Sequence, residues 1–503
     1  MKIISAKQSK SLDQETMNKE PISSIDLMER AGLLLFDKIF DRFGKKVTYL
    51  ILCGNGNNGG DGLVIARKLL EADCVTFVFI DKNSTQKSSD NLRNLQKLEG
   101  LNIEIFDFSE LNKFTEKNKN HVIIDALFGV GLNRPLENPW AQIILLINET
   151  VGEKVAIDLP SGLLADDIQI ASNSIFKADI TYTIGQPKLS FFLPEIVDFI
   201  GKIEVIDIQL NQTYLNQLES NYYYLDYSMV QKHYKPRKRF SHKGTYGHAL
   251  MIAGSYGKIG ASVLATNAAL KAGAGLVSVY IPSCGYEIIQ SIIPEAMCLT
   301  DDNEHCITTF PNIESYNSVG LGPGLGTDKI TKLAFYHWLQ NTDFEHKSLV
   351  LDADALNMLG QDKDQLQYLP KNTILTPHPK EFERLAGSCK NSLERLKLAQ
   401  DFAQQYHVII VLKDAVSAII SPNKQVYFNS TGNAGLATGG SGDTLTGIIT
   451  GLLAQGYSPL IASKLGVWLH GKSADLALEK ESMESFTASQ ITQYLGQAFQ
   501  SLL

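Results

Sequence analysis

Residues 438–445 read Thr-Gly-Gly-Ser-Gly-Asp-Thr-Leu, and the pattern that follows them is helical. Apolar residues recur there at i, i+3, i+4, i+7 and i+8 and predict one apolar helix face, formed by Leu445, Ile448, Ile449, Leu452 and Leu453. Gly456 would end the helix. The glycines would lie at its N-terminus, where free N–H groups and the helix dipole attract an anion and where a phosphate can approach closely. The stretch therefore predicts a phosphate-binding helix start.

Asp443 falls in the first turn of this predicted helix. An aspartate at that position could simply cap the helix. Four consecutive glycine or serine residues before it are more than a cap needs. A carboxylate beside a bound phosphate suits a base that takes a proton from an attacking hydroxyl. We therefore predict that Asp443 is catalytic.

The length and the charge of the chain limit the kinds of protein it can be. It has 503 residues, of which 44% are hydrophobic and 20% charged, and its net charge is −8. This length predicts two or more domains. The acidic balance argues against a nucleic-acid binder, which usually carries a basic excess. We read the basic run at 235–239 as the solvated edge of a linker.

The six cysteines are scattered, and no two of them form a C-x-x-C pair. Neither a zinc site nor a redox motif is therefore predicted. Free cysteines are typical of a reducing compartment. The N-terminal segment lacks the apolar core of a signal peptide, and no apolar run is long enough to span a bilayer. We expect a cytoplasmic protein that does not bind a membrane.

Short apolar runs alternate with helical patterns throughout, which predicts an α/β fold in both halves of the chain. The first half resembles a Rossmann-like doubly wound sheet, in which ligands bind at the carboxyl ends of the strands. The pattern breaks over residues 211–240, and we place a domain boundary near residue 220. The predicted strands are 49–53, 76–80, 122–125, 154–158, 180–184 and 203–208, then 249–253, 276–281, 318–321, 348–352, 373–376 and 408–412.

Polar or glycine-rich clusters follow four predicted strands of the second half. They are the loop 322–326 (Gly-Pro-Gly-Leu-Gly), the pair Asp352 and Asp354, the segment 376–381 (Thr-Pro-His-Pro-Lys-Glu), and Lys413. Each is weak evidence alone, because a glycine-proline turn is usually just a turn. Four clusters at the carboxyl ends of strands in one sheet together indicate a ligand site.

The second half resembles the ADP-dependent NAD(P)H-hydrate dehydratases of the ribokinase-like superfamily over residues 225–503. The resemblance rests on 243–248 (Lys-Gly-Thr-Tyr-Gly-His), 253–255 (Ala-Gly-Ser), Gly260 with Ala261, and 273–277 (Gly-Ala-Gly-Leu-Val). It implies a ribokinase-like α/β/α domain with Asp443 as the base. It further implies a nucleotide-binding set, which is Lys413, Asp414, Ala415, Val416, Ser417, Ser441 and Gly442. The hydrated nicotinamide would lie by Ala261, Gly324, His378 and Asp443.

The reaction implied by this resemblance is dehydration of (6S)-NAD(P)HX. The C6 hydroxyl would attack the terminal phosphate of ADP, AMP would leave, and the phosphorylated hydroxyl would then be expelled. Such a phosphoryl transfer usually needs Mg²⁺. Lys380, Ala353 and Asp414 stand where the family commonly has glycine, and these departures could alter nucleotide preference or metal geometry.

The first half has its own glycine loop, Gly54-Asn-Gly-Asn-Asn-Gly-Gly-Asp-Gly62, directly after a predicted strand. The loop formally fits the dinucleotide pattern G-x-G-x-x-G, and Asp81 ends the next strand where a ribose-binding acid would be. The two asparagines and the extra Gly-Asp-Gly are not typical of that pattern. The side-chain amides and the carboxylate of this loop favour binding of a polar ligand or a cation. Asp125 and Asp158 also end predicted strands, which predicts that both carboxylates face the ligand crevice.

These features, with Met28-Glu-Arg-Ala-Gly32, resemble the NAD(P)H-hydrate epimerases over residues 1–218. The resemblance implies a potassium ion held by Asn58, Asp125 and Ser161, and Asp158 as the acid/base that opens and recloses the hydrated ring. It implies that NAD(P)HX is bound by Asn57, Asn58, Gly59, Gly60, Asp61, Gly129, Val130, Gly131, Leu132, Asn133, Arg134, Pro135 and Asp158.

One chain with both halves would be a bifunctional repair enzyme. The first half would interconvert (6R)- and (6S)-NAD(P)HX, and the second would return the S form to NAD(P)H. Two alternatives remain open on these residues. The anion site and Asp443 suit a ribokinase-type small-molecule kinase equally well, and the first half could be a non-catalytic binding module. We also expect a homo-oligomer.

Overall fold

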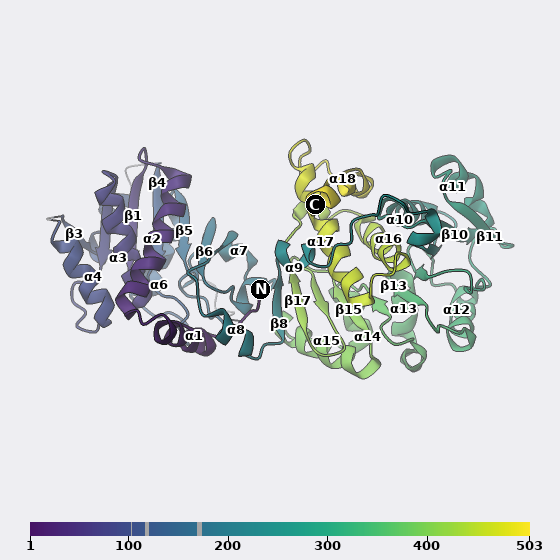
Figure 1. Cartoon of the computed structure of the whole chain (residues 1–503), viewed down its shortest axis with the longest axis horizontal. Coiled ribbons are helices and arrows are strands. Elements are labelled where there is room, and N and C mark those ends of the chain that lie inside the picture. The colour runs from purple at the N-terminus through teal and green to yellow at the C-terminus, as the bar shows by residue number, and fades with distance from the viewer. Residues whose placement is uncertain (102, 116–119, 169–173) are drawn as a thin grey trace. The chain divides into compact units, whose positions relative to one another are not determined.

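The structure is a computed structural model and describes residues 1–101, 103–115, 120–168 and 174–503 (Figure 1). Contacts divide the chain into two compact units, Lys2–Ser220 and Asn221–Leu503, and Met1 packs with the second unit. Both units are built from a largely parallel sheet with helices, so the predicted α/β architecture is confirmed. Among the described residues, no helix is both long enough and apolar enough to cross a membrane.

The first unit contains a seven-stranded parallel sheet. Its strands are β1 (Thr48–Cys53), β2 (Val75–Ile80), β3 (Ile105–Asp107), β4 (His121–Ala126), β5 (Glu153–Ile157), β6 (Ile180–Ile184) and β7 (Lys202–Ile206). Its helices are α1 (Ala6–Lys19), α2 (Ser24–Phe43), α3 (Asn57–Glu71), α4 (Ser89–Glu99), α5 (Asn112–Thr115), α6 (Trp140–Glu149), α7 (Val197–Ile200) and α8 (Gln212–Gln217). The strand order is β3-β2-β1-β4-β5-β6-β7, which reverses direction between β1 and β4.

Separate apolar cores cover the two faces of this sheet. One core contains side chains of α1, α2, α3, α4 and α8, and the other contains side chains of α6. Strand β1 is buried from Tyr49 to Cys53, because a central parallel strand has helices on both sides. The doubly wound sheet is therefore confirmed, and its ligand crevice is expected where the strand order reverses, at the carboxyl ends of β1 and β4.

The second unit contains a ten-stranded sheet in the order β11-β10-β9-β12-β13-β14-β15-β16-β17-β8. The strands are β8 (Tyr222–Leu225), β9 (His248–Ile252), β10 (Leu276–Pro282), β11 (Met297–Asp301), β12 (Ser318–Leu321), β13 (Ser348–Leu351), β14 (Ile374–Leu375), β15 (Ile409–Leu412), β16 (Ala418–Ile420) and β17 (Val426–Asn429). The helices are α9 (Tyr227–Gln231), α10 (Ile259–Lys271), α11 (Tyr286–Ile292), α12 (Lys329–Asn341), α13 (Ala353–Gln361), α14 (Pro379–Ala386), α15 (Ser392–Tyr406), α16 (Ser441–Ala454), α17 (Pro459–Ala477) and α18 (Ala488–Gln500). The strands from β11 to β15 are parallel, and β16 runs antiparallel to both of its neighbours.

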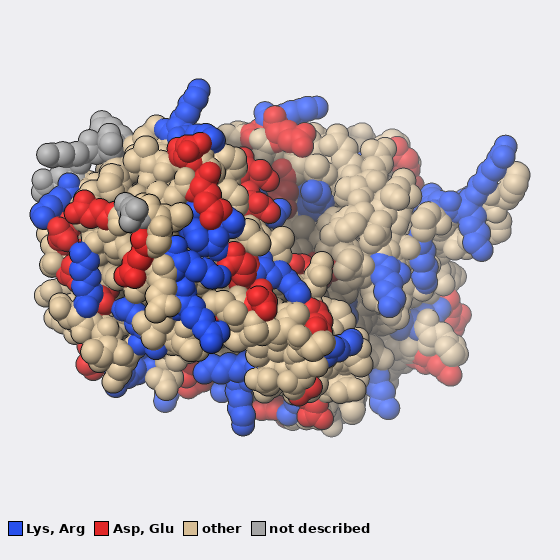
Figure 2. Space-filling model, turned by 60° about the vertical axis from the view of Figure 1, so that its left-hand side comes forward, with Lys and Arg blue, Asp and Glu red and all other residues tan. Residues whose placement is uncertain are grey.

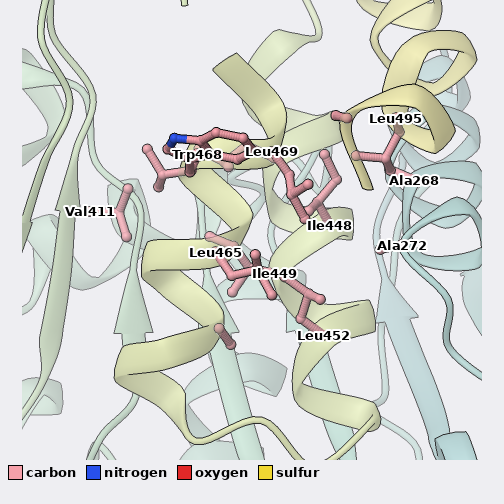
Figure 3. Close-up of a cluster of buried hydrophobic side chains, with 14 of the residues drawn as sticks. Ala268, Ala272, Val411, Ile448, Ile449, Leu452, Leu465, Trp468, Leu469 and Leu495 are labelled. Atoms are coloured by element: carbon pink, nitrogen blue, oxygen red, sulfur yellow. The ribbon is translucent and has the colours of Figure 1, made fainter. Parts of the chain in front are cut away.

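Helix α16 is the central helix of the second unit. The sequence predicts one apolar face, but every residue from Thr444 to Ala454 is buried. The predicted face packs against α17 and α18, as Figure 3 shows for Ile448, Ile449 and Leu452. The opposite face carries glycines, and a Cβ built on Gly447 would lie 2.0 Å from the carbonyl oxygen of Ala265. Helices α10 and α16 therefore pack backbone to backbone. The predicted end of α16 is confirmed, since Gly456 follows it with φ of 80°.

The segment around residues 211–240, which the sequence leaves without a period, contains α8, β8 and α9. Strand β8 pairs with β17, and the rings of Tyr223 and Tyr427 stack at 5.0 Å between centroids. The three consecutive tyrosines of β8 have the high strand propensity of aromatic residues, and this signal could have found it.

Candidate active sites

The predicted anion site of the second unit lies at the start of α16. Gly440 precedes the helix with φ of 89°, a conformation that suits glycine, and Asp443 lies in the first turn. The pKa of Asp443 is raised to about 7, chiefly by burial and also by the nearby Asp352 carboxylate, while Lys413 opposes the rise. A carboxylate with this pKa exchanges a proton readily near neutral pH.

The four predicted clusters come together around Asp443. Its pKa responds to the charges of Asp352 and Asp354, of Glu381 and of Lys413, which come from three different segments. The Nζ of Lys413 lies 2.8 Å from Oδ1 of Asp352. Both groups face the helix start, because a Cβ built on Gly442 would lie 3.1 Å from that Nζ and 3.7 Å from Oδ2 of Asp352.

Thr446 holds Asp352 from inside α16. Its hydroxyl donates to Oδ2 of Asp352 over 2.7 Å. Asp352 is therefore fixed on both oxygens, by Lys413 and by Thr446, and it is 1% exposed.

The glycine loop after β12 closes one side of this site. Ser255 donates its hydroxyl to the carbonyl of Gly324 over 2.8 Å, and the N–H of Gly326 donates to Oδ2 of Asp354 over 2.8 Å. Gly324 has φ of 60°, and a Cβ on it would lie 2.9 Å from Cβ of Ala261. The predicted neighbours Ala261 and Gly324 are therefore in contact range of each other.

His378 and Lys413 lie on adjacent loops after β14 and β15. The N–H of Lys413 donates to the carbonyl of Pro377 over 2.9 Å. His378 caps α14, because its Nδ1 accepts from the N–H of Glu381 while Oε2 of Glu381 accepts from the N–H of His378. The imidazole is half exposed, so it is accessible to a ligand.

The nucleotide-binding residues predicted after Lys413 form the turn between β15 and β16. Asp414 pairs with Arg395 over 3.0 Å, so its charge is compensated within the protein. Ala415 and Val416 continue the turn, and the carbonyl of Ser417 accepts from the N–H of Asn429 over 2.9 Å. Of the other two departures from the family pattern, Lys380 is exposed, and Ala353 begins α13 with φ of 47°.

His470 is a residue of this site that the sequence gives no signal for. It is buried on α17, with Nε2 lying 3.0 Å from the carbonyl oxygen of Ser441 and 3.3 Å from its hydroxyl. Burial lowers the pKa of His470 to about 4, so the ring is neutral at physiological pH. A neutral ring can donate Nε2–H to the carbonyl of Ser441 and fix the first residue of α16.

The first unit has a cavity of about 680 Å³ at the carboxyl edge of its sheet. The loops after β1 and β4 line it, together with α1 and α2. The predicted site residues on its wall are Asn57, Asn58, Asp61, Gly129, Val130, Gly131, Leu132, Asn133, Arg134 and Asp158. Gly59 and Gly60 lie behind the wall in α3, and Pro135 is exposed beyond the loop.

The residues predicted to hold potassium lie together beside this cavity. The backbone N–H of Ser161 donates to Oδ2 of Asp125, and its hydroxyl donates to Oδ1, each over 2.7 Å. Phe128 joins the third residue, because its carbonyl accepts from the side-chain amide of Asn58 over 3.0 Å while its N–H donates to the hydroxyl of Ser161 over 2.9 Å. Asp125 is fully buried, and no lysine or arginine of the described chain forms an ion pair with it.

Asp158 is held in a strained backbone conformation at the end of β5. Its φ is 65°, in the left-handed region that few non-glycine residues adopt. The Nζ of Lys188 lies 2.7 Å from Oδ1 of Asp158, and the N–H of Ile184 donates to the same oxygen over 3.1 Å. The sequence gives no signal for Lys188, which follows Gln186-Pro187 outside any motif.

The comparisons with known proteins cover both units. The NAD(P)H-hydrate dehydratase family model matches residues 249–497, and the model described as YjeF-related protein N-terminus matches residues 24–190. The chain is 34% identical to the bifunctional NAD(P)H-hydrate repair enzyme of Moorella thermoacetica over 100% of this chain and 97% of that protein. It is 32% identical to the enzyme of the same name from Escherichia coli, over 92% of this chain and 87% of that protein.

Two solved structures resemble the second unit. One is the ADP/ATP-dependent NAD(P)H-hydrate dehydratase of Bacillus subtilis co-crystallised with ATP/Mg²⁺, with 31% identity, a TM-score of 0.50, and coverage of 56% of this chain and 99% of that chain. The other is a ribokinase-like superfamily protein from Enterococcus faecalis, with 26% identity, a TM-score of 0.50, and coverage of 57% and 98%. The ribokinase-like fold of the second unit is therefore confirmed.

The full-length relatives decide between the interpretations that the sequence leaves open. These relatives match both halves of this chain, and the name they share describes a repair activity, not a kinase activity. The chain belongs to the bifunctional NAD(P)H-hydrate repair enzymes, with an epimerase domain and a dehydratase domain.

Proposed function

We propose that the start of α16 is the site at which (6S)-NAD(P)HX is dehydrated with ADP as co-substrate. Asp443 takes the proton from the C6 hydroxyl, the hydroxyl attacks the terminal phosphate of ADP, and AMP leaves. Loss of the phosphate together with a ring proton then gives NAD(P)H. The observation that carries this proposal is a partly buried carboxylate with a pKa of about 7 in the first turn of a helix with a glycine-rich start.

The ligands are assigned to the two sides of Asp443. The nucleotide is bound by Lys413, Asp414, Ala415, Val416, Ser417, Ser441 and Gly442. The nicotinamide lies beside Ala261, Gly324 and His378. The proximity of Lys413 to Gly442 supports the first assignment, and the contact between Ala261 and Gly324 supports the second.

Mg²⁺ fits this site as a companion of the phosphates. In the described part of the chain no group of three His, Cys, Asp or Glu side chains could hold a metal by itself. Mg²⁺ commonly keeps water ligands and binds through substrate phosphates plus one or two carboxylates. Asp354 and Glu381, whose charges act on Asp443, are the carboxylates proposed for that role. The ion would neutralise the phosphates during transfer.

Asp443→Asn tests the dehydratase assignment. The amide keeps the shape of the side chain but cannot accept a proton, so recovery of NADH absorbance from (6S)-NADHX and ADP should fall by about 10²-fold or more. Epimerisation, followed by chromatographic separation of the two epimers, should be unchanged. Recovery of NADH at the wild-type rate would reject Asp443 as the base.

In the first unit, Asp158 is proposed as the acid/base that opens and recloses the hydrated ring, and the cavity beside it as the NAD(P)HX site. Its wall includes Asn57, Asp61 and the loop from Gly129 to Arg134. Gly59, Gly60 and Pro135 shape the loops that form the wall. Asp158→Asn should abolish epimerisation while dehydration of the S form continues.

Potassium fits the group formed by Asn58, Asp125 and Ser161. The buried Asp125 carboxylate has no cationic side chain paired with it among the described residues, and alkali cations prefer oxygen ligands such as these and the carbonyl of Phe128. The ion would compensate the buried charge and tie together the loops after β1, β4 and β5. Replacing K⁺ by Li⁺ should lower epimerase activity, and Asp125→Ala should remove that dependence.

We also propose that the chain is cytoplasmic and forms a homo-oligomer. All six cysteines are free, which suits a reducing compartment. Large apolar side chains of α11 and the edge strand β11 are exposed, including Ile292 at 60% and Met297 at 42%. A second copy covering this face would bury them. Light scattering on Ile292→Lys compared with the wild type measures whether the mass falls to that of one chain.

A further inference from the structure

Helix α1 presents one face to the cavity of the first unit. Ser9, Asp13 and Met17, spaced four residues apart, all line that cavity. The helix is anchored at both ends, because the N–H of Ala6 donates to Asp166 over 2.9 Å and the hydroxyl of Thr16 accepts from the N–H of Asn211 over 2.9 Å. The family model match begins at residue 24, so it does not cover this helix.

The cavity therefore has three carboxylates on its wall, those of Asp13, Asp61 and Asp158. Lys188 forms an ion pair with one of these carboxylates, that of Asp158. Lys188 is 4% exposed, and its Nζ contacts Oδ1 of Asp158 at 2.7 Å, the carbonyl of Gln186 at 2.8 Å and the hydroxyl of Thr183 at 3.1 Å. Asp158 thus has a cation that compensates its ionised form, whereas Asp13 and Asp61 have no ion-pair partner in the described chain.

The two remaining acids differ in how easily they release a proton. The pKa of Asp13 is raised to about 6, chiefly by burial and also by the charge of Asp158, while Lys188 opposes the rise. Burial raises the pKa of Asp61 well above its ordinary value, with Asp158 and Asp13 adding to the effect. Asp61 therefore holds its proton more tightly than an ordinary aspartic acid, whereas Asp13, with a pKa of about 6, both gives up and takes back a proton near neutral pH.

We propose that Asp13 is a second catalytic residue of the epimerase, exchanging a proton with the ring nitrogen while Asp158 exchanges one with the C6 hydroxyl. The inference rests on the proposed role of Asp158. An epimerisation that passes through an open ring must move two protons, one at each end of the bond that breaks. Asp158 and Asp13 supply one group for each end.

The step balances without any oxidant or reductant. Asp158 takes the hydroxyl proton, C6–O becomes a carbonyl, and the C6–N1 bond breaks with its electron pair going to N1, which takes a proton from Asp13. The aldehyde turns about the C5–C6 bond. N1 then attacks its other face, returns its proton to Asp13, and the new C6 oxygen regains a proton from Asp158.

Asp13→Asn in the full-length chain tests the inference. The amide cannot transfer the proton, so kcat for interconversion of (6R)- and (6S)-NADHX should fall by about 10²-fold or more, with KM little changed. Asp13→Glu should recover part of that rate. The matched control is Glu15→Gln, an acid-to-amide change on the same helix whose side chain contacts Asn18 and does not line the cavity.

The pH profile separates a chemical role from a structural one. The active form needs Asp13 protonated and Asp158 ionised, so the wild-type rate should fall as pH rises through about 6, and Asp13→Asn should lack that fall. Other titratable groups on the cavity wall are those of Asp61, Arg134 and Lys10, and they are unchanged in the variant.

Three results would overturn the inference: a wild-type rate for Asp13→Asn, a change in KM alone, or a lowered rate with the wild-type pH profile and no recovery in Asp13→Glu. Asp158→Asn reports separately on the proposed function. If Asp158→Asn is fully active, the ring-opening proposal itself fails. If Asp158→Asn is inactive while Asp13→Asn is active, only the role of Asp13 fails.

Discussion

Ala353 lies between two acids of the dehydratase site, and its φ of 47° places it in the left-handed region. A non-glycine residue there costs about 1–2 kcal/mol. Glycine would avoid that cost. However, glycine has greater freedom in the unfolded chain, and losing it on folding destabilises the folded state by about 0.5–1 kcal/mol. We expect Ala353→Gly to raise the free energy of unfolding of the second unit by roughly 0.5–1 kcal/mol, the difference of these two terms.

Urea unfolding followed by circular dichroism measures this change. Ala353→Val is the opposite control, since a β-branched side chain tolerates positive φ less well than alanine. A lower stability for the glycine variant would mean that the positive φ is not a source of strain.

The pKa of Asp443 predicts the pH dependence of dehydration. A base acts in its ionised form, and burial raises this pKa to about 7. The kcat/KM for (6S)-NADHX should therefore rise with pH up to about 7 and level off above it. Asp352→Asn removes the like charge that raises this pKa, and it frees Lys413, which lowers it. The acidic limb should shift to lower pH in that variant, and an unchanged limb would assign it to another group.

At the scale of the helix, the glycines of α16 decide how closely α10 can approach. A Cβ on Gly447 would lie 2.0 Å from the carbonyl oxygen of Ala265 and 2.8 Å from Cβ of Ala268. Gly447→Ala forces the two helices apart, and such overpacking costs about 1–3 kcal/mol. We expect lower thermal stability of the second unit and weaker dehydration, with epimerisation unchanged.

Gly496→Ala is the matched control for that change. Gly496 lies in α18, and a Cβ on it meets nothing within 4 Å. Alanine is favoured over glycine by about 1 kcal/mol in a helix interior, so this variant should be slightly more stable. If Gly447→Ala and Gly496→Ala changed the thermal stability equally, the close contact between α10 and α16 would not explain why residue 447 is glycine.

The same elements show how far the sequence predicts this molecule. The central strands were predicted to within one or two residues, because strands buried on both faces leave continuous apolar runs. Strands β3, β8, β11, β16 and β17 were not predicted, since β3 and β16 have three residues each and β11 lies exposed at an edge. Helix α16 has no polar face because it is enclosed on all sides, which a helical period alone cannot reveal.

The sequence offers candidate site residues where loops follow strands, and it offers none where a group comes from a segment without a local motif. Asp125 lies near the end of β4, Asp158 follows β5 and Asp443 lies in the first turn of α16, at the sheet edge where parallel topology gathers ligand-binding groups. Asp13, Lys188 and His470 reach their sites from segments remote in sequence and have no local motif. Only tertiary packing brings them there.

At the scale of the whole molecule, each unit carries a complete set of proposed catalytic groups. All residues lining the 680 Å³ cavity lie between Ser9 and Leu210, and the groups acting on Asp443 lie between Asp352 and Lys413. Among the described residues, neither set includes one from the other unit. The two activities should therefore be separable by point substitutions in the intact chain.

This independence predicts complementation between two defective chains. Given both epimers of NADHX and ADP, Asp158→Asn should convert the S form and leave the R form to slow uncatalysed ring opening. Asp443→Asn should equilibrate the epimers and produce no NADH. A mixture of the two variants should convert both epimers completely, because the S epimer released by one chain diffuses to the other. Time courses of NADH absorbance measure this, and R epimer persisting in the mixture would mean that the two sites must act within one chain.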